Sequence, residues 1–219
     1  MPETRLSASA QSSLMDHVSE HGSFSSPYMA NVCSDFAALD AADVADIAHF
    51  FCVLHGRHPG VVDHASIKTA DEEARDWFVQ AMDGFAAERA FLTKLTVSAG
   101  PISGVSANDQ SNATLTAQCK ALEMLSQSDR SGCALGASLA LVLDWQSIRS
   151  VLEQIALKLD VEPRQWPLPS VEATEALNAQ LSRSPAMARA INFGVDQILS
   201  QHRGLWQLLE ARRNVRANG

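Results

Sequence analysis

The sequence predicts an all-α protein that folds as a single-domain helical bundle of six or seven helices. Alanine and leucine recur at spacings of three and four residues, which is the period of an amphipathic helix. Valine, isoleucine, tyrosine and threonine do not alternate with polar residues as they would in strands. With 219 residues, of which 46% are hydrophobic and 19% charged, the chain can bury a substantial core, so we expect one domain.

The N-terminal segment differs in composition from the rest of the chain. Residues 1–26 are rich in serine and carry a weak helical periodicity over 6–21, which Gly22 ends. We therefore expect a partly helical segment over 1–26, followed by a helical-bundle domain over 27–219.

The first strong helices of the bundle are expected at about 27–39 and 41–55. Gly56 follows the second helix at the position where helices commonly stop, and Pro59 lies shortly beyond it. The region after this turn is expected to lead into a long helix that begins near residue 70 and ends near residue 98.

Thr69 or Asp71 can cap this long helix, and Gly100 and Pro101 end it. A loop rich in glycine, serine and asparagine is expected over 99–112. Ser184 and Pro185 provide an N-cap and a first helical residue for the last helix. The remaining helices are expected at about 113–128, 132–159, 171–181 and from 185 onward.

Three polar residues, Glu88, Asp144 and His202, fall on the apolar faces of three of these helices. A buried carboxylate must be paired, protonated or bound to a metal, because an isolated charge in an apolar interior is very costly. The three side chains could therefore surround a divalent transition metal. Alternatively, His202 is an ordinary core histidine and arginines satisfy the two acids. The candidate arginines are Arg89, Arg130 and Arg149.

Asp46 and His49 form an acid-x-x-His pair that lies on one face of the 41–55 helix and could add ligands to such a metal. Di-iron bundles use two Glu-x-x-His motifs and two further glutamates. This chain has one such motif, with aspartate in the first place, so it departs from that pattern.

The turn after the 41–55 helix concentrates titratable side chains. Its imidazoles could converge on a metal, one could act as a general base, or the turn could bind a small molecule. Alternatively, these residues cap a helix end and face solvent. The candidate residues are His55, Arg57, His58, Asp63 and His64.

A second motif, His17-x-x-Glu20-His21, matches the zinc-binding pattern H-x-x-E-H of inverzincin peptidases. That chemistry requires both histidines on one helical turn, a glutamate that polarises zinc-bound water and a further acidic ligand. Gly22 ends the helix directly after the motif, and the mixed strand and helix framework is absent. A zinc peptidase is therefore a remote alternative.

Composition and motifs exclude several classes of function. A formal charge of −8 argues against nucleic acid as a partner. The N-terminus lacks an apolar signal segment, and the longest apolar run, 133–142, is too short to span a membrane and predicts a buried helix. Four cysteines without a C-x-x-C pair indicate free thiols in the cytoplasm. No phosphate-binding glycine loop or nucleophile elbow is present.

Four short stretches carry a resemblance to a known family: GRHPG at 56–60, DHA at 63–65, SDR at 128–130 and GCALG at 132–136. With these stretches the chain resembles a small family of uncharacterised bacterial helical proteins over roughly residues 50–150. The resemblance implies a bacterial, cytoplasmic protein, and it implies no activity, cofactor or catalytic residue.

We expect from these observations a protein that binds a small molecule or a metal within the bundle core, and we leave open whether it is an enzyme. The alternative is a non-enzymatic interaction or regulatory module. In that case Trp166, Trp206 and neighbouring leucines would form an apolar surface for a homodimer or another partner.

Overall fold

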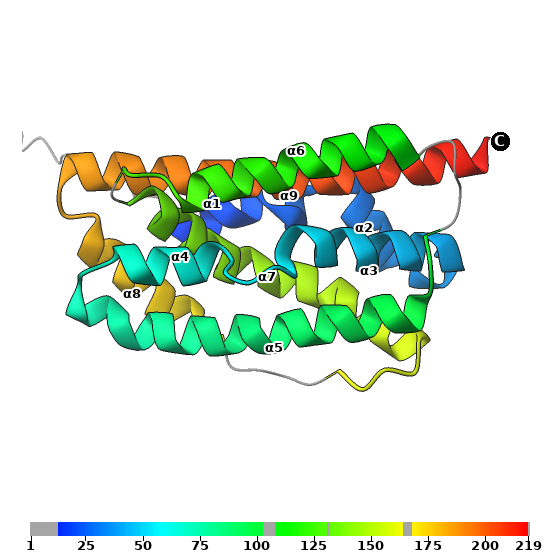
Figure 1. The fold of residues 1–219 in the computed structure, drawn as a ribbon, viewed down its shortest axis with the longest axis horizontal. Helices are drawn as coiled ribbons and strands as arrows, with labels where there is room; N and C mark the ends of the chain where they lie inside the picture. The colour runs from blue at the N-terminus through cyan, green and yellow to red at the C-terminus, as the bar shows by residue number, and fades with distance from the viewer. Residues whose placement is uncertain (1–12, 103–107, 131, 164–167, 219) are drawn as a thin grey trace, which may run out of the picture.

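The computed structural model describes residues 13–102, 108–130, 132–163 and 168–218 (Figure 1). These ranges contain nine α-helices and three short 3-10 helices and no strand, which confirms the all-α prediction. The helix number slightly exceeds the expected six or seven. The α-helices are α1 (Leu14–His21), α2 (Pro27–Ser34), α3 (Ala41–His55), α4 (Val61–Lys68), α5 (Arg75–Ala99), α6 (Asn108–Ser126), α7 (Cys133–Lys158), α8 (Val171–Leu181) and α9 (Pro185–Ala217).

Helix starts follow the capping residues in the sequence. The Ser26 and Ser184 side chains each accept a backbone N–H, and each precedes a proline at the first helical position. Asp40 and Asp43 form a reciprocal capping box at the start of α3. Because these caps are local, the starts of α2, α3 and α9 agree with the expected ones.

Three elements differ from the sequence prediction. The expected 27–39 helix is interrupted at Asp35, whose side chain caps the 3-10 helix Phe36–Ala38. The short helix α4 lies between the 41–55 helix and the long helix, where we expected a turn and no helix. Helix α6 begins at Asn108, so the expected loop over 99–112 is shorter; residues 103–107 lie outside the described ranges.

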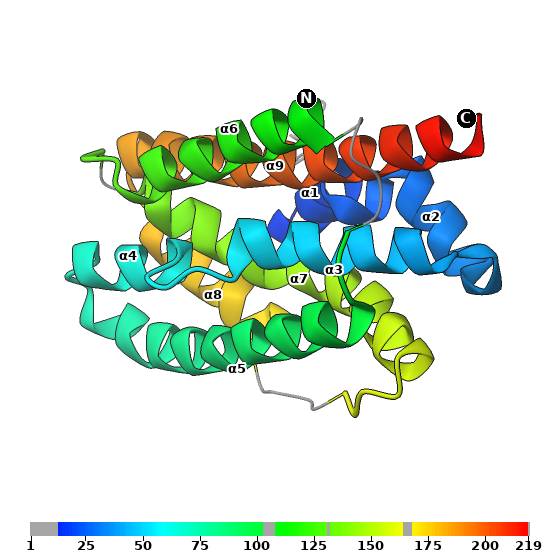
Figure 2. The same ribbon diagram turned by 45° about the vertical axis from the view of Figure 1, so that its right-hand side comes forward.

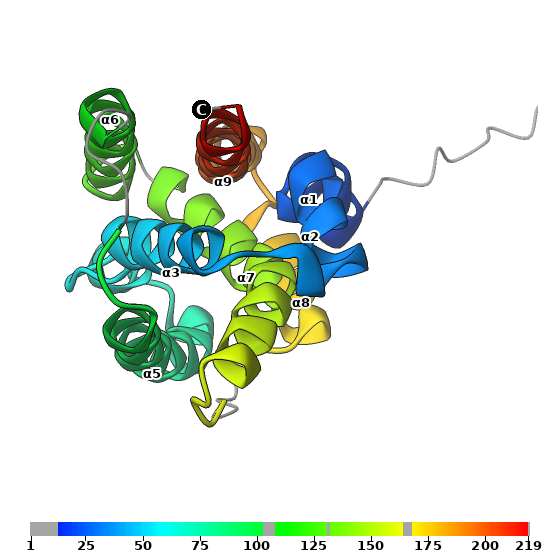
Figure 3. The same ribbon diagram turned by 90° about the vertical axis from the view of Figure 1, so that its right-hand side faces the viewer.

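Helix α7 is the central element of the bundle. It contacts every other α-helix of the described chain, and the end-on view in Figure 3 shows it surrounded by its neighbours. All of its residues from Cys133 to Trp145 are buried, which confirms the prediction of a buried helix over 133–142. A helix that is apolar on every side belongs in the core of a bundle.

Helices α7 and α9 pack most closely where glycines face the neighbouring backbone. A Cβ atom on Gly136 would overlap the backbone of Ile191, and one on Gly194 would overlap the carbonyl oxygen of Cys133. The other helices cover α7 on several sides, with α3, α4 and α5 on one side and α1 and α2 on another (Figure 2).

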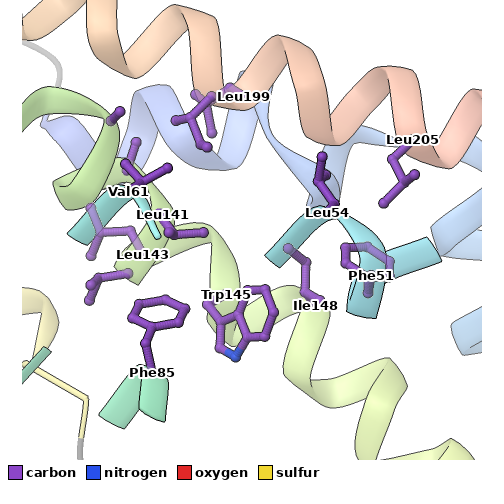
Figure 4. Close-up of a cluster of buried hydrophobic side chains, with 14 of the residues drawn as sticks. Phe51, Leu54, Val61, Phe85, Leu141, Leu143, Trp145, Ile148, Leu199 and Leu205 are labelled. Carbon is purple, nitrogen blue, oxygen red and sulfur yellow. The ribbon is translucent and has the colours of Figure 1, made fainter. Parts of the chain in front are cut away.

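The hydrophobic core is continuous along the bundle. Figure 4 shows Trp145 of α7 beside Phe85 of α5, with Phe51 of α3 nearby. Phe85 and Phe51 each meet the Trp145 ring in an edge-to-face arrangement, with centroids 5.3 and 6.4 Å apart. This aromatic group forms one wall around His55, the last residue of α3.

Candidate functional site

A chain of hydrogen-bonded polar side chains crosses the core. Asp144 of α7 accepts hydrogen bonds from the backbone N–H and the hydroxyl of Ser23, at 2.8 and 2.7 Å. Nδ1 of His202, on α9, lies 2.5 Å from Oδ2 of Asp144. Nε2 of His202 in turn lies 2.9 Å from Nε2 of His55. All four residues are buried, so the chain links the short 3-10 helix Ser23–Ser25 to the C-terminus of α3 through the interior.

The network assigns the protons on both imidazoles. The backbone N–H of Ser23 can only donate, and with two further donors Asp144 acts as a carboxylate that accepts throughout. A neutral His202 donates from Nδ1 to this carboxylate, which leaves its Nε2 as an acceptor. His55 must donate from Nε2, so its Nδ1 carries the free lone pair.

Burial, and after it the neighbouring His202, lower the pKa of His55 well below 6.5. Both effects act against a positive charge on His55, the first because burial desolvates the imidazolium and the second because a positive charge on His202 would repel it. His55 is therefore neutral near neutral pH and can accept a proton.

A pocket of about 260 Å³ opens beside His55. Apolar side chains from α3, α4, α5, α6 and α7 contribute much of its wall, whereas the polar residues come mainly from the turn after α3 and from α6. The apolar lining residues include Leu54, Val62, Phe85, Leu122 and Leu141, and the polar ones include His55, Arg57, His58, His64, Arg89 and Glu123.

The positive groups around the pocket are not equivalent. Arg89 of α5 donates to Asp63 at 3.1 Å, and Asp63 also accepts the backbone N–H of Gly60 at the start of α4. Arg57 is exposed, lines the pocket and forms no ion pair with any residue of the described ranges. Its guanidinium group is therefore available to an anion.

The turn residues predicted from the sequence therefore divide between two roles. His55, Arg57, His58 and His64 line one pocket, whereas Asp63 is buried behind it and holds Arg89 and the first turn of α4. The helix end at His55 agrees with the sequence interpretation, and the same residue also reaches the pocket.

Glu88 and Asp144 are both buried as predicted, but they have separate partners. Glu88 forms an ion pair with Arg149 and accepts a hydrogen bond from the indole of Trp145 at 3.1 Å. Asp144 binds His202 instead. The structure thus pairs one acid with an arginine, as in the alternative interpretation, and brings the other to the inward histidine.

Asp46 and His49 do not converge either. Asp46 is buried and accepts two hydrogen bonds of 2.9 Å from Arg212, and it also pairs with Arg216. His49 lies 2.7 Å from the carbonyl oxygen of Gly100 through Nε2. Within the described part of the chain, no three histidine, cysteine or acidic side chains come together as a ligand set for a metal.

The H-x-x-E-H residues lie on α1 at the surface. His17 pairs with Asp196 of α9 at 2.8 Å, and the rings of His17 and His21 are 4.5 Å apart. Glu20 lies 3.9 Å from His21 and is exposed. Each of these contacts is a surface pair.

Of the two tryptophans that we expected on a partner surface, the structure describes Trp206 only. Trp206 is fully buried and packs against Phe51 and Tyr28, so it contributes to the core and not to a surface. Trp166 lies outside the described residues.

Sequence reasoning missed Ser23, Cys119 and Glu123. Ser23 follows Gly22 in the serine-rich segment, and no periodicity distinguishes it from the serines around it. Cys119 and Glu123 line the pocket from α6. Burial raises the pKa of the Cys119 thiol and outweighs the opposite effect of Arg57, so the pocket faces a thiol.

The model of a "Family of unknown function (DUF6975)" matches residues 18–217 of the chain. No curated protein and no solved structure matches the chain. In addition, the described helices include none with the length and apolar character that crossing a bilayer requires.

Proposed function

The chain belongs to this family of unknown function, and we propose that it binds a small organic anion in the pocket beside His55. The observation that carries the proposal is a pocket of about 260 Å³ that combines apolar walls with a cation that has no ion-pair partner among the described residues. Pockets of this kind bind ligands through apolar contacts, and a few polar groups fix the orientation of the ligand.

The apolar part of the ligand would lie against Leu54, Phe85 and Leu141 on the inner side of the pocket. Its acidic group would pair with Arg57, because a guanidinium group suits carboxylate and phosphate oxygens. Arg89 supports this arrangement from a fixed position, since its ion pair with Asp63 holds it against the turn. The geometry favours a small molecule over a metal because, among the described residues, no three histidine, cysteine or acidic side chains come close enough together to form a ligand set.

Binding can be tested with small carboxylates and phosphate monoesters, each paired with a neutral amide or alcohol of the same shape. We expect acids, and not their neutral analogues, to shift the NMR signals of pocket residues. Arg57→Met should weaken binding of the acids by roughly 10- to 100-fold, the value of one charge-assisted pair. Arg75→Met is the matched control, because Arg75 is exposed at the start of α5 and lies outside the pocket.

Two results would contradict the proposal. One is that no acid perturbs the pocket signals, and the other is that the Arg57 variant binds acids as tightly as the parent protein. Equal losses in the Arg57 and Arg75 variants would point to a general effect of net charge.

We also propose a cytoplasmic location. The four cysteines are free thiols, and Cys33 is exposed, a state that suits a reducing compartment. Fractionation of the source cells with an antibody to the protein checks this, and recovery in an exported fraction would contradict it.

A further inference from the structure

The chain of hydrogen bonds ends at His55, which lines the pocket and can therefore contact a bound ligand. We propose that His55 is the general base of the pocket, that His202 takes up a proton from it, and that Ser23 and Asp144 are positioning residues that hold His202 in place. The inference rests on the proposed binding of an organic anion, and it names the reaction class: removal and return of a proton on that molecule.

The first support is the direction of the hydrogen bonds. With both imidazoles neutral, Asp144 accepts from Nδ1 of His202 and Nε2 of His202 accepts from His55, so each ring has one tautomer. The remaining ring nitrogen, Nδ1 of His55, belongs to a side chain that lines the pocket. A base held in one tautomer by a partner that is itself oriented by a carboxylate is the arrangement that general-base catalysis requires.

The second support is that the network can hold the accepted proton. When a C–H bond of the bound acid breaks, its electron pair stays on the ligand as an enolate and its proton goes to Nδ1 of His55. The proton on Nε2 of His55 can then move to Nε2 of His202, 2.9 Å away. The positive charge thereby comes to lie on His202, beside the Asp144 carboxylate at 2.5 Å.

The reverse transfers return the proton to the same or a neighbouring carbon of the ligand. These proton transfers balance in atoms and charge without an oxidant, a reductant or a second substrate. The overall reaction is an isomerisation or a racemisation. Arg57, on the rim of the pocket, is the group that would face the negative charge of the enolate.

The surroundings of His55 suit this role. A neutral imidazole fits its buried position, and Trp145 covers it at a centroid distance of 5.3 Å. Acidic and basic groups approach from several elements around it. They are Arg57 and His58 of the turn, His64 of α4, Arg89 of α5, Cys119 and Glu123 of α6, Asp144 of α7 and His202 of α9.

The tautomers provide a test that needs no ligand. In long-range ¹H–¹⁵N spectra of the histidine rings at neutral pH, we expect His55 protonated only at Nε2 and His202 only at Nδ1. His17, which pairs with Asp196 at the surface, serves as the reference for an ordinary histidine–aspartate pair. A His55 ring protonated at Nδ1, or a His202 ring protonated only at Nε2, overturns the relay even if the pocket binds anions.

The base itself can be tested with nitrobenzisoxazole, a neutral probe that eliminates to a coloured phenolate when a base removes its ring proton. We expect His55→Gln to lower the rate by about 100-fold or more, the usual contribution of a general base. His202→Gln and Asp144→Asn should lower it by about tenfold and change its pH profile, which a purely structural role would not do.

His17→Gln is the matched control, because it removes a histidine paired with an aspartate outside the pocket. Its rate should equal that of the parent protein. Each variant is compared only after its circular dichroism and unfolding midpoint show a folded protein. Equal rates for the parent and the His55 variant overturn the assignment of the base, whereas failure of the anion test with correct tautomers would reject the proposed ligand and leave the relay in place.

Discussion

The carboxylate of Asp144 accepts two hydrogen bonds from one residue, the backbone N–H and the hydroxyl of Ser23. An acceptor this deeply buried depends on its donors, because the protein interior cannot replace them with water. The third donor, His202, is fixed by the other two, since they hold the carboxylate in one orientation. The orientation of Asp144 and His202 therefore depends on Ser23, which lies outside the main helices of the bundle.

Ser23→Ala removes the hydroxyl donor and leaves the backbone donor in place. We expect a loss of about 1.5–3 kcal/mol in the free energy of unfolding, the value of a hydrogen bond to a charged group. Chemical unfolding followed by circular dichroism measures it. Ser25→Ala is the control: its exposed hydroxyl donates to the carbonyl of Gly22, so its removal should cost below about 0.5 kcal/mol. Equal losses in the two variants would contradict the role of Ser23.

The lowered pKa of His55 also predicts how stability depends on pH. The unfolded chain binds a proton at this residue near pH 6.5, whereas the folded protein resists it. Stability from this group is present above pH 6.5 and is lost as the pH falls below that value, at up to about 1.4 kcal/mol per pH unit.

Urea unfolding of the parent and of His55→Gln across this range measures the difference. The variant should lose less stability on acidification than the parent protein, because it lacks the group whose pKa falls on folding. Parallel pH curves for the parent and the His55 variant would contradict the prediction.

At the scale of residues, the sequence correctly predicts which polar side chains are buried, but it does not identify the residues that they contact. Helical spacing placed Glu88, Asp144 and His202 inside, and all three are buried. Spacing within a helix cannot show which residues of other helices face them, because partners such as Arg149 for Glu88 lie far away in sequence. The metal cluster that we inferred from the three together is accordingly not assembled.

At the scale of helices, the contact between α7 and α9 depends on the absence of side chains at two glycines. Gly136 and Gly194 each face backbone atoms of the opposite helix, which cannot move aside as a flexible side chain can. Gly136 and Gly194 thus allow the two helices to pack closely.

Gly194→Ala should therefore destabilise the protein by about 1–3 kcal/mol or more, because the new methyl group overlaps the Cys133 carbonyl. Gly204→Ala, on the same helix, is the control. A Cβ there meets only the amide end of Gln118, at 2.8 Å, and alanine favours a helix over glycine by about 0.5–1 kcal/mol. Thermal unfolding compares the two, and a Gly194 variant as stable as the Gly204 variant would refute the packing argument.

Helix α4 shows why the sequence prediction of the elements was incomplete. The helix has eight residues, and its N-cap is Gly60, whose backbone N–H donates to the Asp63 side chain. Segments this short have little helical stability in isolation and form because they pack against neighbours, here α5, α6 and α7. The local signals of glycine and proline therefore indicated a turn.

At the scale of the molecule, the core is one continuous cluster with α7 at its centre. The prediction of a single all-α domain needed only composition and periodicity, because those set how much surface must be buried. The arrangement of helices around α7, and with it the pocket, depends on contacts between distant segments that no local pattern encodes.

A continuous core predicts one cooperative unfolding transition. Tryptophan fluorescence, to which the buried Trp77, Trp145 and Trp206 contribute, and far-ultraviolet circular dichroism should give the same midpoint in urea within error. A fluorescence change that precedes the loss of helix would show that the centre of the bundle separates from the outer helices and would contradict this expectation.

The buried relay draws its members from both extremes of the described chain, with Ser23 near one end and His202 on the last helix. Proteins are synthesised from the N-terminus, and early segments can fold while later ones are still being made. Asp144 therefore lacks its partner His202 while the bundle is only partly formed, until α9 has left the ribosome. The completed relay would be one of the last features that a newly made molecule acquires.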